Sequence, residues 1–239
     1  MGMLACSQKN CTKCGKLHCI NNIPLLSNLS EAEAEKISSG VTTVSYKKGS
    51  YLFKAGEKAN KLFILCQGRV KLFKINSEGK EQIIYIMSDG DFFGAFNLLK
   101  EDEFDMDAVA LEDSDVSLLA KSEFDKIILS NPEITLKVFE KAYERITKAE
   151  ALVERLSINN LDSKVAGLLV HLAKEFGIET KEGTLIRLSI SREEMGSYAG
   201  IARETMSRKL NYFQEIGLII VKNKKQILIK NMVDLENLC

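Results

Sequence analysis

Glycines at regular intervals are the feature of this chain that most restricts its fold. Gly49, Gly56, Gly68, Gly79 and Gly90 stand 7 to 12 residues apart, and short apolar or alternating runs lie between them. Glycine supplies the positive φ of tight hairpin turns, and short strands between such turns are typical of a sandwich or barrel. We therefore expect strands at 41–46, 51–53, 62–66, 70–75, 82–87 and 116–119, with a hairpin tip at 76–79.

A long helical pattern follows these strands. A short helix is predicted over 122–129, and the next helix, over 133–156, has apolar residues at alternating steps of three and four. That heptad spacing is typical of a helix that packs against a second helix. Packing on its own domain is the alternative, but the stripe is narrow and its surroundings are charged. The predicted dimer interface comprises Phe139, Ala142, Ile146, Ala149, Val153 and Leu156.

Beyond a hinge at 159–163, the pattern predicts a small helical domain. A helix at 165–176 ends at Gly177 and precedes a strand at 185–190. Residues 191–194 (SREE) have a capping-box pattern, Gly200 ends the second helix, and a third covers 203–216. Strands at 218–221 and 226–229 follow. Two helices joined by a tight turn, followed by a two-stranded wing, are typical of a winged helix-turn-helix.

The second helix of such a motif places its N-terminal residues in the DNA major groove. Residues 189–230 hold eight basic and four acidic side chains, although the whole chain has 33 of each sign. This local positive charge suits contact with phosphates; a solvated face on an unrelated helical domain is the alternative. The predicted DNA-contacting residues are Arg203, Glu204, Ser207, Arg208, Arg192, Lys209 and Lys224.

The first 22 residues contain four cysteines, Cys6, Cys11, Cys14 and Cys19, and no Asp or Glu. No apolar run approaches the about 20 residues that cross a membrane, and no signal peptide is visible, so we expect a cytoplasmic protein. Structural disulfides are rare there. Thiolates at this spacing suit an iron–sulfur cluster or a zinc ion held by four thiolates or by three with His18. We interpret His18 as a spacer residue rather than a ligand. A thiol redox switch is a third interpretation.

Several motifs together resemble the CRP/FNR family of transcription regulators. Residues 190–196 (ISREEMG) and 203–208 (RETMSR) are similar to its helix-turn-helix, and residues 52–57 (LFKAGE), 65–71 (LCQGRVK) and 90–94 (GDFFG) to its barrel. The resemblance implies an α+β fold: an N-terminal β jelly-roll barrel, a long dimerisation helix and a C-terminal winged helix-turn-helix. The expected divisions are a cysteine-rich arm at 1–22, a sensory barrel at 23–130, the dimerisation helix and hinge at 131–160, and a DNA-binding domain at 161–239.

The resemblance also indicates which small molecules the barrel is not expected to bind. Family members that bind cyclic nucleotides have Gly-Glu-Leu and an Arg-Ser or Arg-Thr pair. This chain instead has Gly94-Ala95-Phe96, and residues 104–108 read FDMDA. The ribose-binding Glu is missing, and carboxylates stand where they would repel a phosphate. We therefore expect neither cAMP nor cGMP as the ligand.

The cysteine arm resembles the ligand run of oxygen-sensing FNR proteins and so implies a [4Fe–4S] cluster on Cys11, Cys14 and Cys19. The fourth FNR cysteine lies in a late barrel strand, where this chain has Ser117. Cys6 and Cys66 are the candidate replacements. Zinc, haem and bare thiols remain alternatives. No role is assigned to Cys239, and His171 is expected to be a core or boundary residue rather than a haem ligand.

These observations predict a homodimeric DNA-binding regulator that responds to oxygen, nitric oxide or redox state. An iron–sulfur electron carrier is the second class considered. No nucleophile–base pair or phosphate loop is present, so we predict that the protein is not an enzyme. The resemblance implies inverted repeats similar to TGTGA, read by Arg203, Glu204 and Arg208. Ser207 matches FNR, whose half-site is TTGAT, and the two half-sites share the TGA core read by Glu204 and Arg208. The resemblance also implies contact with RNA polymerase through the hairpin near Glu78, for which a solvated turn is the alternative.

Overall fold

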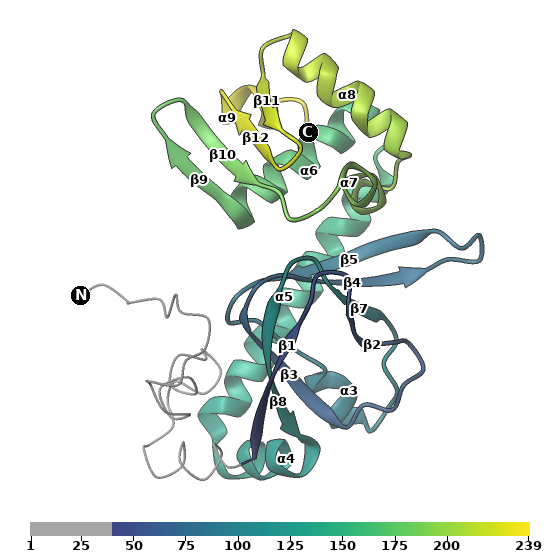
Figure 1. Cartoon of the computed structure of the whole chain (residues 1–239), viewed down its shortest axis with the longest axis vertical. Helices are drawn as coiled ribbons and strands as arrows, with labels where there is room; N and C mark the ends of the chain where they lie inside the picture. Colours follow the sequence, from purple (N-terminus) through teal and green to yellow (C-terminus); the bar gives the residue numbers. More distant parts are fainter. Residues whose placement is uncertain (1–39) are drawn as a thin grey trace.

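The computed structural model describes residues 40–239, so the cysteine arm and a helix predicted from Ser30 to about Ser38 lie outside the described residues. The N-terminal part of the described chain contains two four-stranded antiparallel sheets, in the orders β1-β8-β3-β6 and β2-β7-β4-β5 (Figure 1). The strands are β1 (Val41–Tyr46), β2 (Tyr51–Phe53), β3 (Lys61–Gln67), β4 (Val70–Ile75), β5 (Glu81–Met87), β6 (Phe92–Phe93), β7 (Asp107–Ala110) and β8 (Ser114–Ala120). Six of them match the predicted strands, and the predicted hairpin tip lies between β4 and β5.

Aromatic rings fill the interior between the two sheets. The ring centroids of Phe53 and Phe104 are 3.8 Å apart, and those of Phe63 and Phe93 are 5.4 Å apart. Each of these residues is buried, and aromatic pairs at such separations stabilise a core beyond the area they bury. Gly94, at φ 89°, then lets the chain turn from β6 into the short helix α3 (Ala95–Lys100).

The β3–β4 connection constrains the backbone at two points. β3 pairs with β8, and the register shifts between Leu65 and Gln67, so Cys66 lies at a β-bulge. Gly68 follows with φ 110°, and a Cβ atom there would lie 2.8 Å from the Cα atom of Ser114. Only glycine therefore fits this turn, and the bulge redirects the Cys66 side chain relative to its neighbours.

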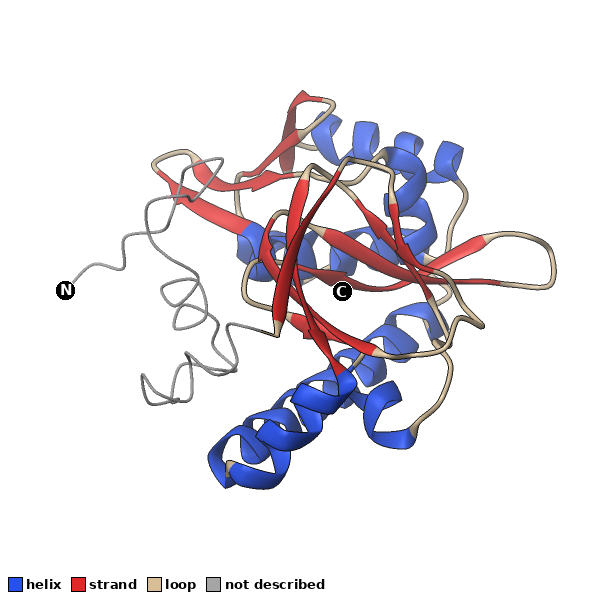
Figure 2. Cartoon of the chain, turned by 60° about the horizontal axis from the view of Figure 1, so that its bottom comes forward, coloured by secondary structure: helices blue, strands red, loops and turns tan. Residues whose placement is uncertain are grey.

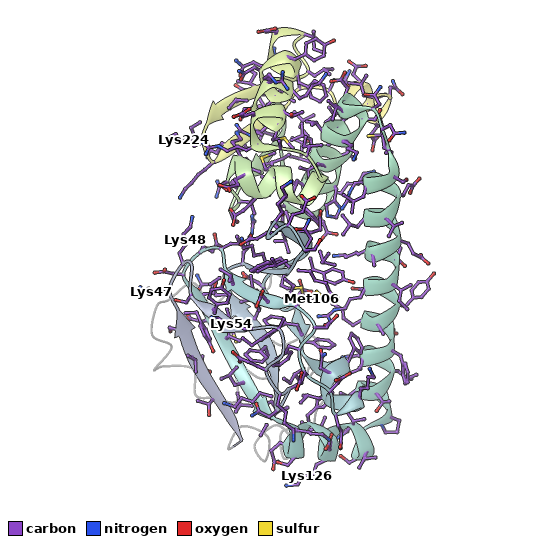
Figure 3. The ribbon with its side chains drawn as sticks, turned by 90° about the vertical axis from the view of Figure 1, so that its right-hand side faces the viewer. Lys47, Lys48, Lys54, Met106, Lys126 and Lys224 are labelled. Atoms are coloured by element: carbon purple, nitrogen blue, oxygen red, sulfur yellow. The ribbon has the colours of Figure 1, made fainter. Side chains whose placement is uncertain are left out.

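Two helices follow the barrel, α4 (Lys121–Ser130) and α5 (Pro132–Ser157). Pro132 occupies the first turn of α5, where a missing backbone N–H costs nothing. Figure 2 shows the strands in red and the helices that flank them in blue. Figure 3 shows α5 extending along one side of the molecule, from the base of the barrel to the C-terminal domain. Ile134 and Val138 bury against the barrel, whereas Leu152 buries in the C-terminal cluster.

The C-terminal part combines helices with a third four-stranded sheet, in the order β11-β12-β10-β9. The predicted strand at 185–190 lies earlier, at Gly183–Arg187, and β9 and α9 were not predicted. The elements are α6 (Leu161–Phe176), β9 (Gly177–Thr180), β10 (Gly183–Arg187), α7 (Arg192–Ala199), α8 (Arg203–Glu215), β11 (Ile219–Asn223), β12 (Gln226–Ile229) and α9 (Met232–Glu236). Within residues 40–239, no helix is long and apolar enough to cross a membrane.

Candidate functional site

The α7–turn–α8 unit has the geometry of a helix-turn-helix. The backbone N–H of Glu194 donates to Ser191 Oγ over 3.2 Å, and the backbone N–H of Ser191 donates to Glu194 Oε2 over 2.8 Å. The predicted capping box is thus confirmed. Gly200, at φ 67°, ends α7 as predicted. A Cβ atom at Gly196 would lie 2.6 Å from the Ile201 carbonyl oxygen, so glycine allows α7 to approach the turn closely.

Helix α8 has one buried and one exposed face. Met206, Leu210 and Phe213 are fully buried in the domain core. Arg203, Glu204 and Arg208 are exposed, and Ser207 is half-buried, so these four predicted residues occur together along the first half of α8. No side chain caps the N-terminus of α8, where Ala202 is the N-cap. Its first backbone N–H groups are therefore suited to donate hydrogen bonds to a DNA phosphate.

The other three predicted DNA contacts are placed differently. Lys209 Nζ lies 2.7 Å from Asp162 Oδ1, at the start of α6, so this side chain is engaged within the domain rather than joining the exposed group. Arg192 is half-buried, its Nη1 lies 3.4 Å from Met195 Sδ, and burial lowers its pKa. Lys224 is exposed in the β11–β12 turn and extends from the wing in Figure 3.

A basic groove lies between the wing and the barrel. Its volume is about 440 Å³, and four cationic side chains and one carboxylate, Glu112, contribute to its lining. Lys48 and Lys224 lie on the same side of the molecule in Figure 3. The sequence analysis did not find this group, because no local pattern connects positions so far apart in the chain. The four cationic residues are Lys48, Arg69, Arg187 and Lys225.

The barrel brings Cys66 next to Ser117. The Sγ and Oγ atoms are 3.1 Å apart, and Ser117 is buried in β8. Desolvation raises the pKa of the Cys66 thiol, and the charges of Asp115 and Asp89 raise it further, against the hydrogen bonds of Ser117. Cys66 is therefore a protonated thiol at neutral pH in the absence of a metal. In the part of the chain that the structure describes, no three His, Cys, Asp or Glu residues gather as a metal site.

The segments at 94–96 and 104–108, which lack the expected cyclic-nucleotide motifs, form other contacts. Ala95 is buried at the start of α3, and Asp105 Oδ2 lies 3.1 Å from Lys74 Nζ. Arg145 enters this region from α5: its Nη2 donates to the Phe92 carbonyl over 2.8 Å, and its guanidinium lies 5.1 Å from the Phe96 ring centre. Burial lowers the pKa of Arg145. The heptad pattern alone gave no sign of this inward-pointing arginine.

His171 is half-buried, as predicted. Its Nε2 lies 2.8 Å from the hydroxyl of Tyr198, which packs from α7. Burial lowers the pKa of His171 to about 4, and the nearby charge of Arg155 lowers it in the same direction. The imidazole is therefore neutral at physiological pH and serves the packing of α6 on α7.

Large apolar side chains along one side of α5 are left uncovered. We name this set, whose members are 55% to 72% exposed, the α5 stripe: Leu136, Phe139, Tyr143, Ile146 and Val153. Leu136 and Tyr143 were not predicted.

The remaining predicted interface residues are half-buried. Ala142 and Ala149 flank the stripe, whereas Leu156 packs beside Gly200. An exposed apolar surface of this kind on a helix is typical of an interaction site.

Comparisons with known proteins match both halves of the described chain. Residues 43–131 match the family described as a cyclic nucleotide-binding domain, and residues 163–238 match the Crp-like helix-turn-helix domain. The solved structure of FixK2 from Bradyrhizobium japonicum is similar, with a TM-score of 0.74 and 25% identity over 83% of this chain and 96% of that one.

Two regulators are similar over most of their length. Electron transport regulator A of Shewanella oneidensis is 30% identical over 183 residues, which cover 77% of this chain and 73% of that protein. The Fumarate and nitrate reduction regulatory protein of Vibrio cholerae is 28% identical over 227 residues, which cover 93% of this chain and 90% of that protein.

Proposed function

The chain belongs to the CRP/FNR family of DNA-binding transcription regulators, and from this premise we propose that it is a homodimer that reads TGTGA-like inverted repeats in response to oxygen, nitric oxide or redox state. The family assignment favours a regulator over the electron carrier considered from the sequence. The observation that carries the proposal is the exposed group of Arg203, Glu204 and Arg208 at the start of α8.

The chemistry of these side chains suits a TGTGA half-site. Arginine donates two hydrogen bonds to the O6 and N7 atoms of guanine, and glutamate accepts one from the amino group of cytosine. Arg203 and Arg208, which precede and follow Glu204 along α8, can therefore each read a guanine. Glu204 can read a cytosine that pairs with a guanine of the half-site. The uncapped amides at Ala202 suit the adjacent phosphate, and Lys224 suits a second phosphate from the wing.

The family binds DNA as a dimer, and the α5 stripe supplies the surface for it. Its members follow heptad steps on a helix that is 26 residues long, as in two-stranded coiled coils. Two copies related by a twofold axis would present two α8 helices to two inverted half-sites.

The exposed hairpin near Glu78 is the surface we assign to RNA polymerase.

Relatives support a redox or anaerobic signal. Their names include an anaerobic regulatory protein and a fumarate and nitrate reduction regulator, and this chain has Cys11, Cys14 and Cys19 at FNR-like spacing. We assign a [4Fe–4S] cluster to these three thiolates with Cys66 as the fourth, because Cys66 lies beside Ser117. Cys6 is the alternative fourth ligand. When bound, such a cluster supplies redox chemistry sensitive to oxygen.

The test is to purify the full chain without oxygen and record its visible absorption together with iron, sulfide and zinc contents. A broad charge-transfer band that bleaches in air, with about four irons per chain, is the expected result. One zinc per chain would instead indicate a closed structural site, and a sharp Soret band would indicate haem. Neither outcome would support the cluster.

A second measurement tests DNA reading. Mobility shift assays should show binding to an inverted repeat of TGTGA by anaerobic protein and weaker binding after exposure to air. Selection of sites without a TGA core from a random DNA pool would contradict the assignment of Glu204 and Arg208.

A further inference from the structure

One buried lysine connects the barrel to the helix-turn-helix. Lys71, in β4, is only 6% exposed. Its Nζ lies 2.6 Å from Glu81 Oε2, in the neighbouring strand β5, and 3.0 Å from Glu194 Oε1, in α7. Glu81 belongs to the barrel and Glu194 to the capping box of α7. We call these three residues the interdomain bridge. A single ammonium group thus binds carboxylates from both domains.

Further contacts surround the interdomain bridge. Ser197 Oγ donates to the Glu81 carbonyl over 2.6 Å and accepts the backbone N–H of Ile83 over 3.2 Å. Ile83 and Phe73 are completely buried and belong to the same apolar cluster as the core of the C-terminal domain. Figure 1 shows α7 directly against the β4–β5 hairpin. The hairpin is therefore a docking surface for the first helix of the motif.

Arg69 makes a separate contact between the domains. Its Nη1 donates to the Arg187 carbonyl over 3.0 Å and to Ser189 Oγ over 2.7 Å, just before α7 begins. Polar contacts from β4 and from the turn before it thus hold α7 and the segment before α7. Because two separate sets of contacts join the domains, the C-terminal domain has a defined orientation relative to the barrel.

The covalent connection between the dimerisation helix and the DNA-binding domain is short but carries few constraints of its own. Only Ile158, Asn159 and Asn160 separate α5 from α6, and both asparagines are exposed. A hinge of this kind allows rotation. Helix α5 also contacts the C-terminal domain directly, because Leu152 buries in its core and Leu156 packs beside Gly200. The barrel contacts act together with these to set the angle of α7 and α8 relative to α5.

Both carboxylate partners stabilise the charged form of Lys71. Burial alone lowers the pKa of Lys71, but hydrogen bonds to Glu81 and Glu194 outweigh that effect and raise it overall, so the side chain is charged. Undocking α7 takes Glu194 away from Lys71 and leaves Glu81 as the carboxylate partner of the ammonium group. The loss of the ion pair with Glu194 therefore opposes rotation of the domain.

We propose that Lys71 is a positioning residue for DNA reading: by bridging Glu81 and Glu194, it fixes the helix-turn-helix against the barrel and so sets the separation of the two α8 helices in the dimer. The inference rests on the proposed function, since this separation matters only for a dimer on two half-sites. The reading residues Arg203, Glu204 and Arg208 remain exposed in the docked arrangement, so docking is compatible with DNA binding.

Three substitutions test the role of the bridge. Lys71→Met keeps an unbranched apolar stem of similar length but removes the charge. Glu194→Gln removes the negative charge while a glutamine still serves the capping box. Lys71→Arg is the matched control, because a guanidinium can bind two carboxylates. Each full-length variant is compared with wild type on inverted repeats whose spacer is varied by single base pairs, and on a DNA with one half-site.

Lys71→Met and Glu194→Gln should bind the best inverted repeat about tenfold more weakly, because the second half-site is then engaged at a lower effective concentration. Their affinity for one half-site should stay unchanged, and their preference for one spacer length should be reduced. Lys71→Arg should retain most of the wild-type behaviour. Equal losses on both DNAs would indicate general destabilisation and would overturn the proposal, as would unchanged spacer preference.

Hydrogen exchange without DNA provides an independent readout. The Ile83 amide donates to Ser197 only in the docked arrangement, so it should exchange faster in Lys71→Met and Glu194→Gln than in wild type. Unchanged exchange would overturn the docking role even if DNA binding were altered. If the Ile83 amide exchanges faster in the variants but the wild-type protein binds no inverted repeat, the docking role of the interdomain bridge is supported and the proposed function is contradicted. Failure of the docking role and failure of the proposed function are therefore distinguishable.

Discussion

The Sγ atom of Cys66 lies 3.1 Å from the Oγ atom of Ser117, across the pairing of β3 with β8. Ser117 stands where the resemblance to FNR proteins places a cysteine ligand. A thiol missing from one strand is therefore present on the adjacent strand, at a bulge that turns its side chain out of the regular pattern. This relationship gives a direct test of the fourth ligand.

We expect Cys66→Ser to abolish the air-sensitive absorption and the bound iron of anaerobic protein. Adding Ser117→Cys to that variant should restore both, because the new thiol lies on the adjacent strand at nearly the same place. Cys6→Ser is the matched control and should retain the cluster. Iron, sulfide and visible absorption are measured on the same samples. If Cys6→Ser loses the cluster and Cys66→Ser keeps it, the arm supplies all four ligands.

Replacing Arg203 should weaken DNA binding and relax one position of the half-site. We expect Arg203→Ala to cost about 1–3 kcal/mol of binding free energy on the TGTGA site and less on sites changed at the guanine it reads. Lys209→Met is the control, because Lys209 pairs with Asp162 rather than extending toward DNA. Fluorescence anisotropy on substituted half-sites measures both. An equal loss of affinity on every site would indicate that Arg203 contacts a phosphate rather than a base.

Charge in the α5 stripe should separate the subunits. Ile146→Glu places a carboxylate in the centre of the apolar surface, where burial against a second copy would be costly, and we expect a shift from dimer to monomer at micromolar concentration. Leu129→Glu is the control, since Leu129 is also apolar and is even more exposed than Ile146, but lies on α4. Analytical ultracentrifugation gives the masses. A dimer that survives Ile146→Glu would place the interface elsewhere.

Acid should destabilise the C-terminal domain through His171. Its folded-state pKa, lowered to about 4, is below the ordinary value of 6.5, so the unfolded chain takes up the proton first as the pH falls. Stability is therefore lost between pH 6.5 and 4, by about 3 kcal/mol in total. His171→Gln removes the titrating group, and its unfolding free energy in urea should change less over this interval. If the free energy of unfolding falls equally with pH in wild type and in His171→Gln, the linkage to His171 is contradicted.

The sequence analysis predicted the elements whose local signals are strong. Alternating apolar residues and intervening glycines located β1 to β5 and β8, and the capping box located the start of α7. β6 was missed because it has only two residues, and β7 because it begins within an acidic stretch that includes Asp105 and Asp107. β9 was missed because every residue in it is exposed, which leaves no alternation to detect.

Contacts between distant segments were beyond the reach of a single sequence. Lys71 and Glu194 are separated by 123 positions, and neither the strand nor the helix pattern shows that they pair. Lys209 was predicted to contact DNA as one of the basic residues of the 189–230 segment, but one step along a helix from Arg208 rotates a side chain by about 100°. That rotation directs Lys209 toward Asp162. In the α5 stripe, heptad spacing identified Phe139, Ile146 and Val153 but did not distinguish Ala142 from the adjacent Tyr143.

The turn at Gly68 has a consequence for how a signal could travel. Cys66 precedes this turn by two residues, and Arg69 and Lys71 follow it by one and three. The proposed cluster ligand and the residues that hold the DNA-binding domain thus lie within five positions of one another on one hairpin. Because Gly68 is packed against the backbone of Ser114, the turn has little room to absorb a displacement. Movement of Cys66 would pass along the backbone to the interdomain bridge before it reached α5.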